Sequence, residues 1–231
     1  MPNWRVNYAG LTRFEWFTDR FQNIMISHGY RSVFSVGNFS TNLIYKETNG
    51  AASRRDSINT KDFYPKYQIA QIGIAEQLSP LIGVDATLKN NLTFRLEYKT
   101  SRNLILTLVN NRLNENTLRE WTVGAGYRWN NPRLPFLVNG ELRELKNDLN
   151  LRFDLNIRDN YMIMRDLDGV EPQPSGGGRT VSVKPSADYI LNDMINVRFF
   201  VDYQLSTPYI STSFPNSQTS GGVSLRFTLA N

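Results

Sequence analysis

The stretch Leu92-Thr93-Phe94-Arg95-Leu96-Glu97-Tyr98-Lys99 alternates strictly between apolar and polar residues. Successive side chains of a β-strand point to opposite faces of a sheet, so this segment has one wholly apolar face and one polar, charged face. Such a strand needs an apolar environment on one side and water on the other. The same pattern recurs in residues 121–129, 149–157, 181–191, 195–205 and 223–229. The sequence therefore predicts an all-β protein built from one repeated amphipathic strand.

The composition excludes several classes of protein. The chain has 231 residues, 40% of them hydrophobic. It contains no run of the roughly 18 to 20 apolar residues that a membrane-spanning helix needs. Cysteine is absent, which excludes a disulfide framework, a thiol nucleophile and a cysteine-ligated metal site. The net charge is +5, and acidic residues are spread among the basic ones, so no basic block predicts nucleic-acid binding.

Strand length and aromatic placement favour a transmembrane β-barrel. We expect about twelve antiparallel up-and-down strands, mostly of about nine to twelve residues, which suits the roughly 9 to 11 residues of a tilted membrane strand. Trp121 and Trp129 bracket one apolar face. Eight residues at about 3.3 Å each, tilted by about 40°, span about 20 Å, close to the roughly 25 Å apolar band that aromatic girdles flank in such barrels.

The expected connections also fit a barrel, in which short periplasmic turns alternate with longer external loops. Polar segments predict short turns at residues 79–80, 89–91, 158–160 and 192–193, and long loops at 47–64 (with Asn59), 130–147, 166–178 and 206–220. Residues 171–178 are rich in Pro and Gly and read as a loop tip. Residues 11–23, which are aromatic-rich and irregular, predict a short amphipathic helix or a turn.

Two alternative architectures remain open from the residues alone. A soluble β-sandwich also has alternating strands, although its strands are shorter and its apolar faces carry occasional charges. A complete barrel of about twelve strands, acting as a porin or a surface adhesin, would have the same strand pattern as a larger one. Detergent dependence would separate both barrels from the soluble, binding β domain.

The polar faces of the strands would line the lumen of a barrel. The charged residues on them are Arg5, Arg95, Glu97, Lys99, Arg128, Arg152, Asp154, Arg158, Lys184, Asp188, Arg198, Asp202 and Arg226. They form either a generic hydrated wall or a mixed-charge surface that tunes what passes. Gly124 and Gly126 leave the wall bare beside Arg128, which predicts close approach by another element, such as a plug, or flexibility at a bend.

The residues give no indication of catalysis or of a cofactor. His28 is the only histidine, and Ser27 beside it points to the opposite face of a strand, so the two cannot pair as base and nucleophile. One histidine and no cysteine make a zinc site improbable. The glycines at 176–178 lack the Lys-Ser/Thr that follows them in a phosphate-binding loop. We therefore expect a protein that is not an enzyme and holds no metal.

Short motifs along the whole chain resemble the C-terminal end of the SprA/Sov family of cell-surface gliding-motility and type IX secretion proteins. They are PNWR (2–5), SHGYRS (27–32), EQLSPLIG (76–83), LKNN (88–91), DLNLR (148–152), IRDN (157–160), PYISTSFP (208–215) and SLRFTL (224–229). The resemblance implies an outer-membrane translocon of a Gram-negative bacterium, exposed at the cell surface, that passes folded cargo proteins. It also implies lipid, cargo and plug or accessory subunits as partners, and one arc of a barrel of about 36 strands.

The two ends of the chain fit the same expectation. The N-terminus begins directly with strand-like alternation and lacks the basic, apolar and small-residue regions of a signal peptide. We therefore expect residues 1–231 to be the C-terminal part of a longer outer-membrane barrel protein. The ending Leu229-Ala230-Asn231 resembles the C-terminus of the family.

One loop predicts a contact at the barrel mouth. In residues 207–220, three bulky apolar side chains stand between two prolines: Tyr209, Ile210 and Phe214. These side chains either pack on the rim of the barrel or dock a partner or plug outside it, since an exposed apolar patch usually marks a contact.

Overall fold

The computed structural model describes residues 1–58, 61–138, 141–144, 147–169, 171–192, 195–210 and 213–228. Some residues of the segments predicted above lie outside these ranges, namely residues 59–60, 139–140, 145–146, 170, 193, 211–212 and 229–231. The described chain is all-β and antiparallel, as the alternation predicts.

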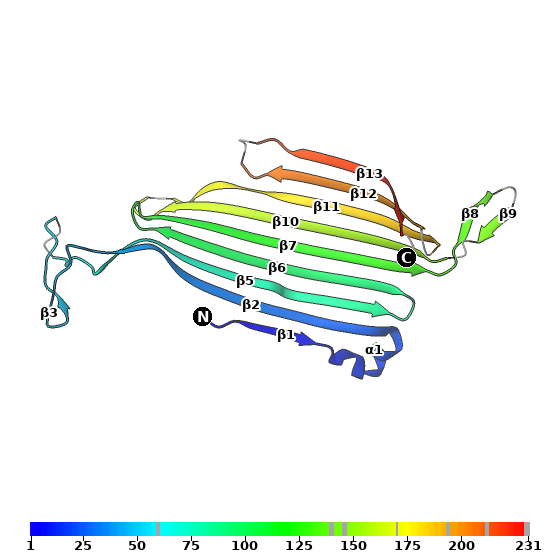
Figure 1. Cartoon of the computed structure of the whole chain (residues 1–231), viewed down its shortest axis with the longest axis horizontal. Coiled ribbons are helices and arrows are strands. Elements are labelled where there is room, and N and C mark those ends of the chain that lie inside the picture. The colour runs from blue at the N-terminus through cyan, green and yellow to red at the C-terminus, as the bar shows by residue number, and fades with distance from the viewer. Residues whose placement is uncertain are drawn as a thin grey trace.

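Nine strands form the main sheet, and each pairs with the next one in an up-and-down order (Figure 1). The strands, in sheet order, are β1 (Trp4–Tyr8), β2 (Phe21–Thr41), β5 (Tyr67–Leu88), β6 (Leu92–Thr107), β7 (Arg112–Trp129), β10 (Leu149–Asp166), β11 (Gln173–Asn192), β12 (Ile195–Pro208) and β13 (Asn216–Phe227). Every pairing between them is antiparallel.

Small elements fill the longer connections. The 3-10 helix η1 (Gly10–Arg13) and helix α1 (Glu15–Arg20) join β1 to β2, which confirms the short helix expected in this region. Neither helix in the described part of the chain is long or apolar enough to cross a membrane. Two hairpins stand outside the main sheet: β3 (Glu47–Thr48) with β4 (Ala51–Ala52), and β8 (Arg133–Val138) with β9 (Glu141–Glu144).

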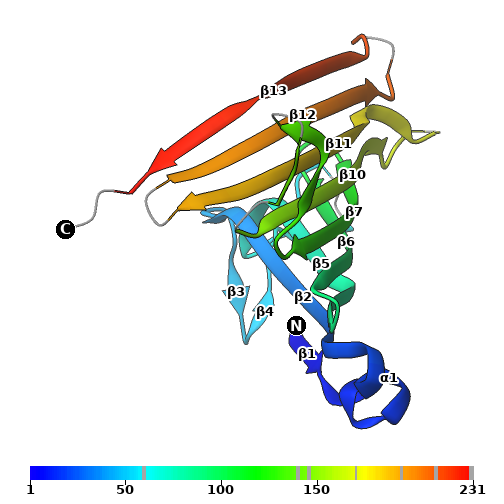
Figure 2. The same ribbon diagram turned by 90° about the vertical axis from the view of Figure 1, so that its right-hand side faces the viewer.

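The main sheet is a single curved layer without a conventional core (Figure 2). Among the described residues, the only buried hydrophobic side chains are Ile24 and Ala86. A β-sandwich would bury one face of each sheet against the other. Here no described strand packs over either face, so the structure does not support the sandwich alternative.

The expected strand number and length were wrong. The main sheet has nine strands instead of about twelve, and apart from β1 these run from 12 residues in β13 to 22 in β5. Three predicted connections lie inside strands: residues 79–80 in β5, 158–160 in β10, and 173–178 in β11. Residues 158–160 remain extended because ladder partners hold them on both sides, and β10 pairs with residues of 173–178. Pro80 lies where the pairing of β5 with β2 and with β6 shifts at a bulge.

The expected alternation of short turns and long loops was also wrong. Because residues 158–160 belong to β10, the long connection between β7 and β10 lies at the same end of the sheet as the short turn at 89–91. We call this the turn end. The opposite end, called the loop end, carries the connections 42–66, 108–111, 167–172 and 209–215.

Candidate functional site

One face of the sheet carries a continuous apolar band. Residues paired across neighbouring strands share a face, so the ladder that joins Tyr98 to Trp121 and Trp121 to Ile157 extends this face through Val181 to Leu205. A row is the set of residues that the ladder pairs across neighbouring strands. We define the apolar band as the part of this face between the row of Trp121 and the row of Phe227, which lies at the turn end. In the described chain, no Asp, Glu, Lys or Arg lies on it.

The height of the apolar band matches a membrane. The ladder places Ser217 of β13 in the row of Trp121, and Phe227 follows Ser217 by ten residues in the same strand. The two bounding rows are therefore ten residues apart. Ten residues at about 3.3 Å, tilted by about 40° as in membrane barrels, give a height of about 25 Å. At the loop-end margin Tyr98 stacks on Trp121 with ring centroids 4.4 Å apart. Trp129 and Tyr189 lie near the other margin, so aromatic side chains flank the band at both margins.

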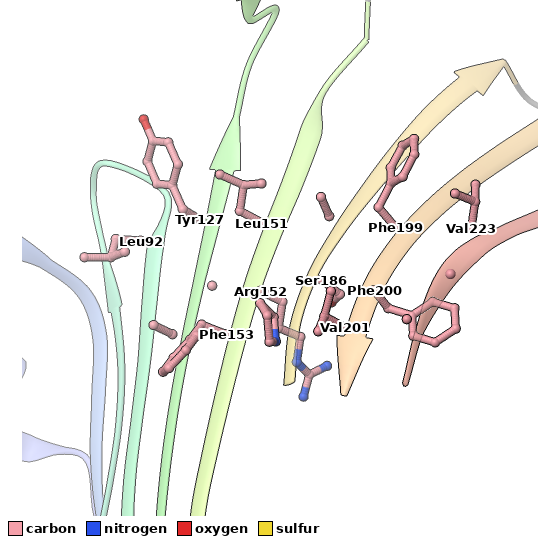
Figure 3. Close-up of a pocket in the computed structure, with 16 residues that line it drawn as sticks. Leu92, Tyr127, Leu151, Arg152, Phe153, Ser186, Phe199, Phe200, Val201 and Val223 are labelled. Atoms are coloured by element: carbon pink, nitrogen blue, oxygen red, sulfur yellow. The ribbon is translucent and has the colours of Figure 1, made fainter. Parts of the chain in front are cut away.

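The apolar band is exposed and is hollowed over the six strands from β6 to β13. Phe227 is 65% exposed, and Trp121, Phe199 and Val223 are also exposed. Figure 3 shows large side chains from β7 to β13 around an open hollow of about 730 Å³. Its floor is low because small residues, Ala125, Ala187 and Gly221, lie between the large ones. An apolar surface of this extent requires an apolar neighbour.

The opposite face carries every charge that the sequence analysis assigned to a lumen. The ladder joins Arg95 to Gly124, Gly124 to Asp154 and Asp154 to Lys184, and the other predicted residues share their parity. This polar face therefore holds Arg5, Arg95, Glu97, Lys99, Arg128, Arg152, Asp154, Arg158, Lys184, Asp188, Arg198, Asp202 and Arg226.

Ion pairs within single strands lie on the polar face. The side chain of Glu97 is only 10% exposed and lies between Arg95, at 3.0 Å, and Lys99, at 3.1 Å. Arg152 bonds Asp154 at 2.8 Å. The exposed pairs contribute little each, about 0 to 1 kcal/mol. Buried Glu97 instead depends on both cations, because an unpaired charge at a buried position is strongly unfavourable.

The two glycines of the polar face make room for neighbouring side chains. A Cβ on Gly124 would lie 3.3 Å from Oδ1 of Asp154, and one on Gly126 would lie 2.5 Å from Oγ1 of Thr93. A hollow of about 510 Å³ lies here, lined among others by Arg95, Arg152 and Asp154. Side chains of neighbouring strands therefore approach both glycines closely, and the plug and the flexible bend stay predictions.

His28 lies on the apolar face, where its Nδ1 is 2.7 Å from the carbonyl oxygen of Leu81. Ser27 occupies the polar face, paired with Gly83. In the described ranges, no group of three or more His, Asp or Glu residues could hold a metal ion. The partner of His28 Nδ1 is thus a backbone carbonyl and not a hydroxyl.

We call residues 209–215, which connect β12 to β13, the rim loop. Its three apolar residues have different environments. Tyr209 donates a hydrogen bond to Asp159, its backbone N–H donates to Gly177 O at 3.0 Å, and its ring lies edge-on to Tyr161. The hydrogen bond to Asp159 raises the pKa of Tyr209. Ile210 is half-buried, whereas Phe214 is 90% exposed. These contacts thus hold Tyr209 against the sheet, whereas the side chain of Phe214 is exposed to any partner.

The sequence analysis missed a charged cluster that lies beyond the apolar band toward the loop end. Glu115 is buried between Arg102, at 2.7 Å, and Arg165, at 3.2 Å, on the same face as the band. The signal was present in β6, because the parity that carries Leu96 and Tyr98 continues into Thr100 and Arg102. Its partners lie on neighbouring strands, and only the register brings them together.

Comparison with the models of known protein families found no match, and no curated protein matches the sequence. The fold and the two faces of the sheet therefore carry the functional argument.

Proposed function

We propose that the chain is a segment of the wall of an outer-membrane β-barrel, with its apolar band against lipid and its polar face lining a hydrated conduit. One observation carries the proposal: in the part of the chain that the structure describes, an uncovered sheet has one face without Asp, Glu, Lys or Arg over about 25 Å of height, while charged residues are spread over the other face. Water could not solvate the first face well, and lipid could not solvate the second.

The free edges of the sheet favour an arc of a larger wall over a complete small barrel. Among the described strands, β1 pairs only with β2, and β13 pairs only with β12. Both outer ladders therefore offer unpaired N–H and C=O groups, which lipid cannot satisfy. Further strands of the same wall would pair with them.

The conduit is proposed to pass folded cargo proteins in a type IX secretion translocon, as the family resemblance implies. The many charged side chains of the polar face support a passive, hydrated path, because they bind water strongly. The partners on this proposal are the lipid bilayer, secreted cargo and plug or accessory subunits. The chemistry needs no cofactor.

Single-cysteine labelling tests the wall, because the chain has no cysteine of its own. Ser182→Cys and Gln204→Cys lie on the polar face, whereas Val183→Cys and Tyr203→Cys are their neighbours on the apolar band. In cells carrying the full-length protein, we expect a water-soluble maleimide to label the first two and not the second two. Labelling of Ser182→Cys should fall when a cargo is arrested in the conduit.

Two results would contradict these proposals separately. Equal labelling of all four variants would contradict the proposal that the sheet is part of a membrane wall. If labelling is selective but an arrested cargo leaves it unchanged, the membrane wall is supported and the translocon role is contradicted. That result would favour a porin or an adhesin.

Phe214 is expected to contact a partner, whereas Tyr209 is expected to hold the loop. Phe214→Ala should leave the stability of the membrane-inserted protein unchanged, because its side chain packs on almost nothing, and should weaken the retention of accessory subunits. Tyr209→Phe, the control, should cost about 1 kcal/mol through the lost hydrogen bond to Asp159. Affinity purification and thermal unfolding check both; full co-purification of all subunits with Phe214→Ala would rule out the docking role.

A further inference from the structure

Four arginines lie beyond the apolar band at the loop end, on the same face of the sheet. Arg119 and Arg179 lie in the first row past Trp121, paired on either side of Asp159. Arg102 and Arg165 follow further out, around Glu115. We call these four residues the arginine belt. Its face is the one that the proposed function turns toward lipid.

The geometry leaves the belt able to bind further anions. Arg179 donates to Asp159 at 2.7 and 3.2 Å, and each of Arg102 and Arg165 makes one bond to Glu115. A guanidinium has five N–H donors, so several remain free on each arginine. The side chains of Arg102, Arg165 and Arg179 are about half exposed. Arg119 is exposed and forms no ion pair with any residue that the structure describes.

The charge and the depth of the belt both suit lipid headgroups. The four arginines face three carboxylates on this face, those of Glu76, Glu115 and Asp159, so the belt keeps a net positive charge. Arg119 and Arg179 lie one row beyond the aromatic margin, the level at which headgroups lie next to a barrel, whereas Arg102 and Arg165 lie two and four rows beyond it. Arginine binds phosphate in a bidentate manner, and basic residues near a membrane surface attract anionic lipids.

We infer that the arginine belt binds the phosphate-bearing headgroups of anionic lipids around the wall. This inference rests on the proposed function, because a belt outside a membrane would meet no headgroups. The belt would hold the wall at a fixed depth, with the apolar band in the hydrocarbon and the loop end outside it. Free phosphate is not the ligand, since the acyl chains must also lie on the apolar band.

The test uses the full-length protein extracted from membranes into a neutral detergent and titrated with short-chain phosphatidylglycerol. Arg119→Gln should weaken this binding about fivefold, the change that corresponds to about 1 kcal/mol for one arginine near a membrane surface. Arg102→Gln should weaken it similarly, and Glu115 stays paired with Arg165 in that variant. Short-chain phosphatidylcholine should bind all variants alike, and equimolar inorganic phosphate should not compete.

Arg158→Gln is the matched control. Arg158 precedes Asp159 in β10 at nearly the same depth, but it lies on the polar face, where it pairs with Glu120 and Thr180 in the ladder. Its removal should leave the binding of phosphatidylglycerol unchanged. Three results would each contradict the inference that the belt binds lipid headgroups: equal weakening by Arg158→Gln, wild-type binding by both belt variants, or competition by phosphate. Recovery of the protein outside the membrane fraction would overturn the proposed function as well.

Discussion

Val201→Arg should remove most of the folded, membrane-inserted protein, whereas Phe200→Arg should leave most of it in place. Both changes put an arginine at the site of an apolar residue, in the middle of the same strand. Val201 lies on the apolar band opposite Gly221, and Phe200 lies on the polar face between Ser186 and Gly222. An arginine on the lipid face near the bilayer midplane costs about 2 to 4 kcal/mol. On the polar face the guanidinium remains hydrated, and the loss is limited to the contact of the Phe200 ring with Gly222.

Heat-modifiable migration of the full-length protein from membrane fractions measures both variants. The expected result is a large loss of the folded form for Val201→Arg and a small loss for Phe200→Arg. Equal losses would mean that both faces meet the same medium, and a larger loss for Phe200→Arg would reverse the assignment of the two faces.

Gly177→Ala should loosen the loop end, and Gly176→Ala should not. Gly177 has φ of +115°, and a Cβ there would overlap the carbonyl oxygen of Asn160. An unfavourable backbone conformation of this kind costs about 1 to 3 kcal/mol before the steric clash is counted. Gly177 O also accepts the backbone N–H of Tyr209, so a shift of the backbone would release the rim loop. A Cβ on Gly176 would lie 3.4 Å from Met162 Sδ, an ordinary contact.

Limited proteolysis of residues 209–215 and thermal unfolding check this pair of variants. We expect faster cleavage and a lower unfolding temperature for Gly177→Ala alone. Similar cleavage of Gly177→Ala and the wild type would show that the rim loop is held by the hydrogen bond from Tyr209 to Asp159 without help from the backbone.

Local patterns predicted the faces of the strands but not their ends. The alternation in residues 92–99 needs only the geometry of an extended chain, so the sides of Phe94 and Arg95 follow from the sequence. Residues 158–160 read as a turn because their polar side chains suit a turn as well as a strand. The pairing of Asp159 with both Arg119 and Arg179 keeps them extended, and such distant partners leave no local signal.

The rim loop shows the same division. Its composition pointed to a contact, and it could not separate Tyr209 from Phe214. Asp159 and Tyr161, which hold Tyr209, are about fifty residues away in the chain.

The sequence by itself determined that the protein is all-β and that each strand has one apolar and one charged face, because side-chain alternation is a property of the extended backbone. Only the tertiary structure decided how the faces align, since register depends on pairing between distant segments. Register stacked the apolar residues into a band of about 25 Å. The order of the described strands leaves β1 and β13 at the two edges of the sheet. Register also brought Arg102, Glu115 and Arg165 together from three strands, on the loop-end side of the band.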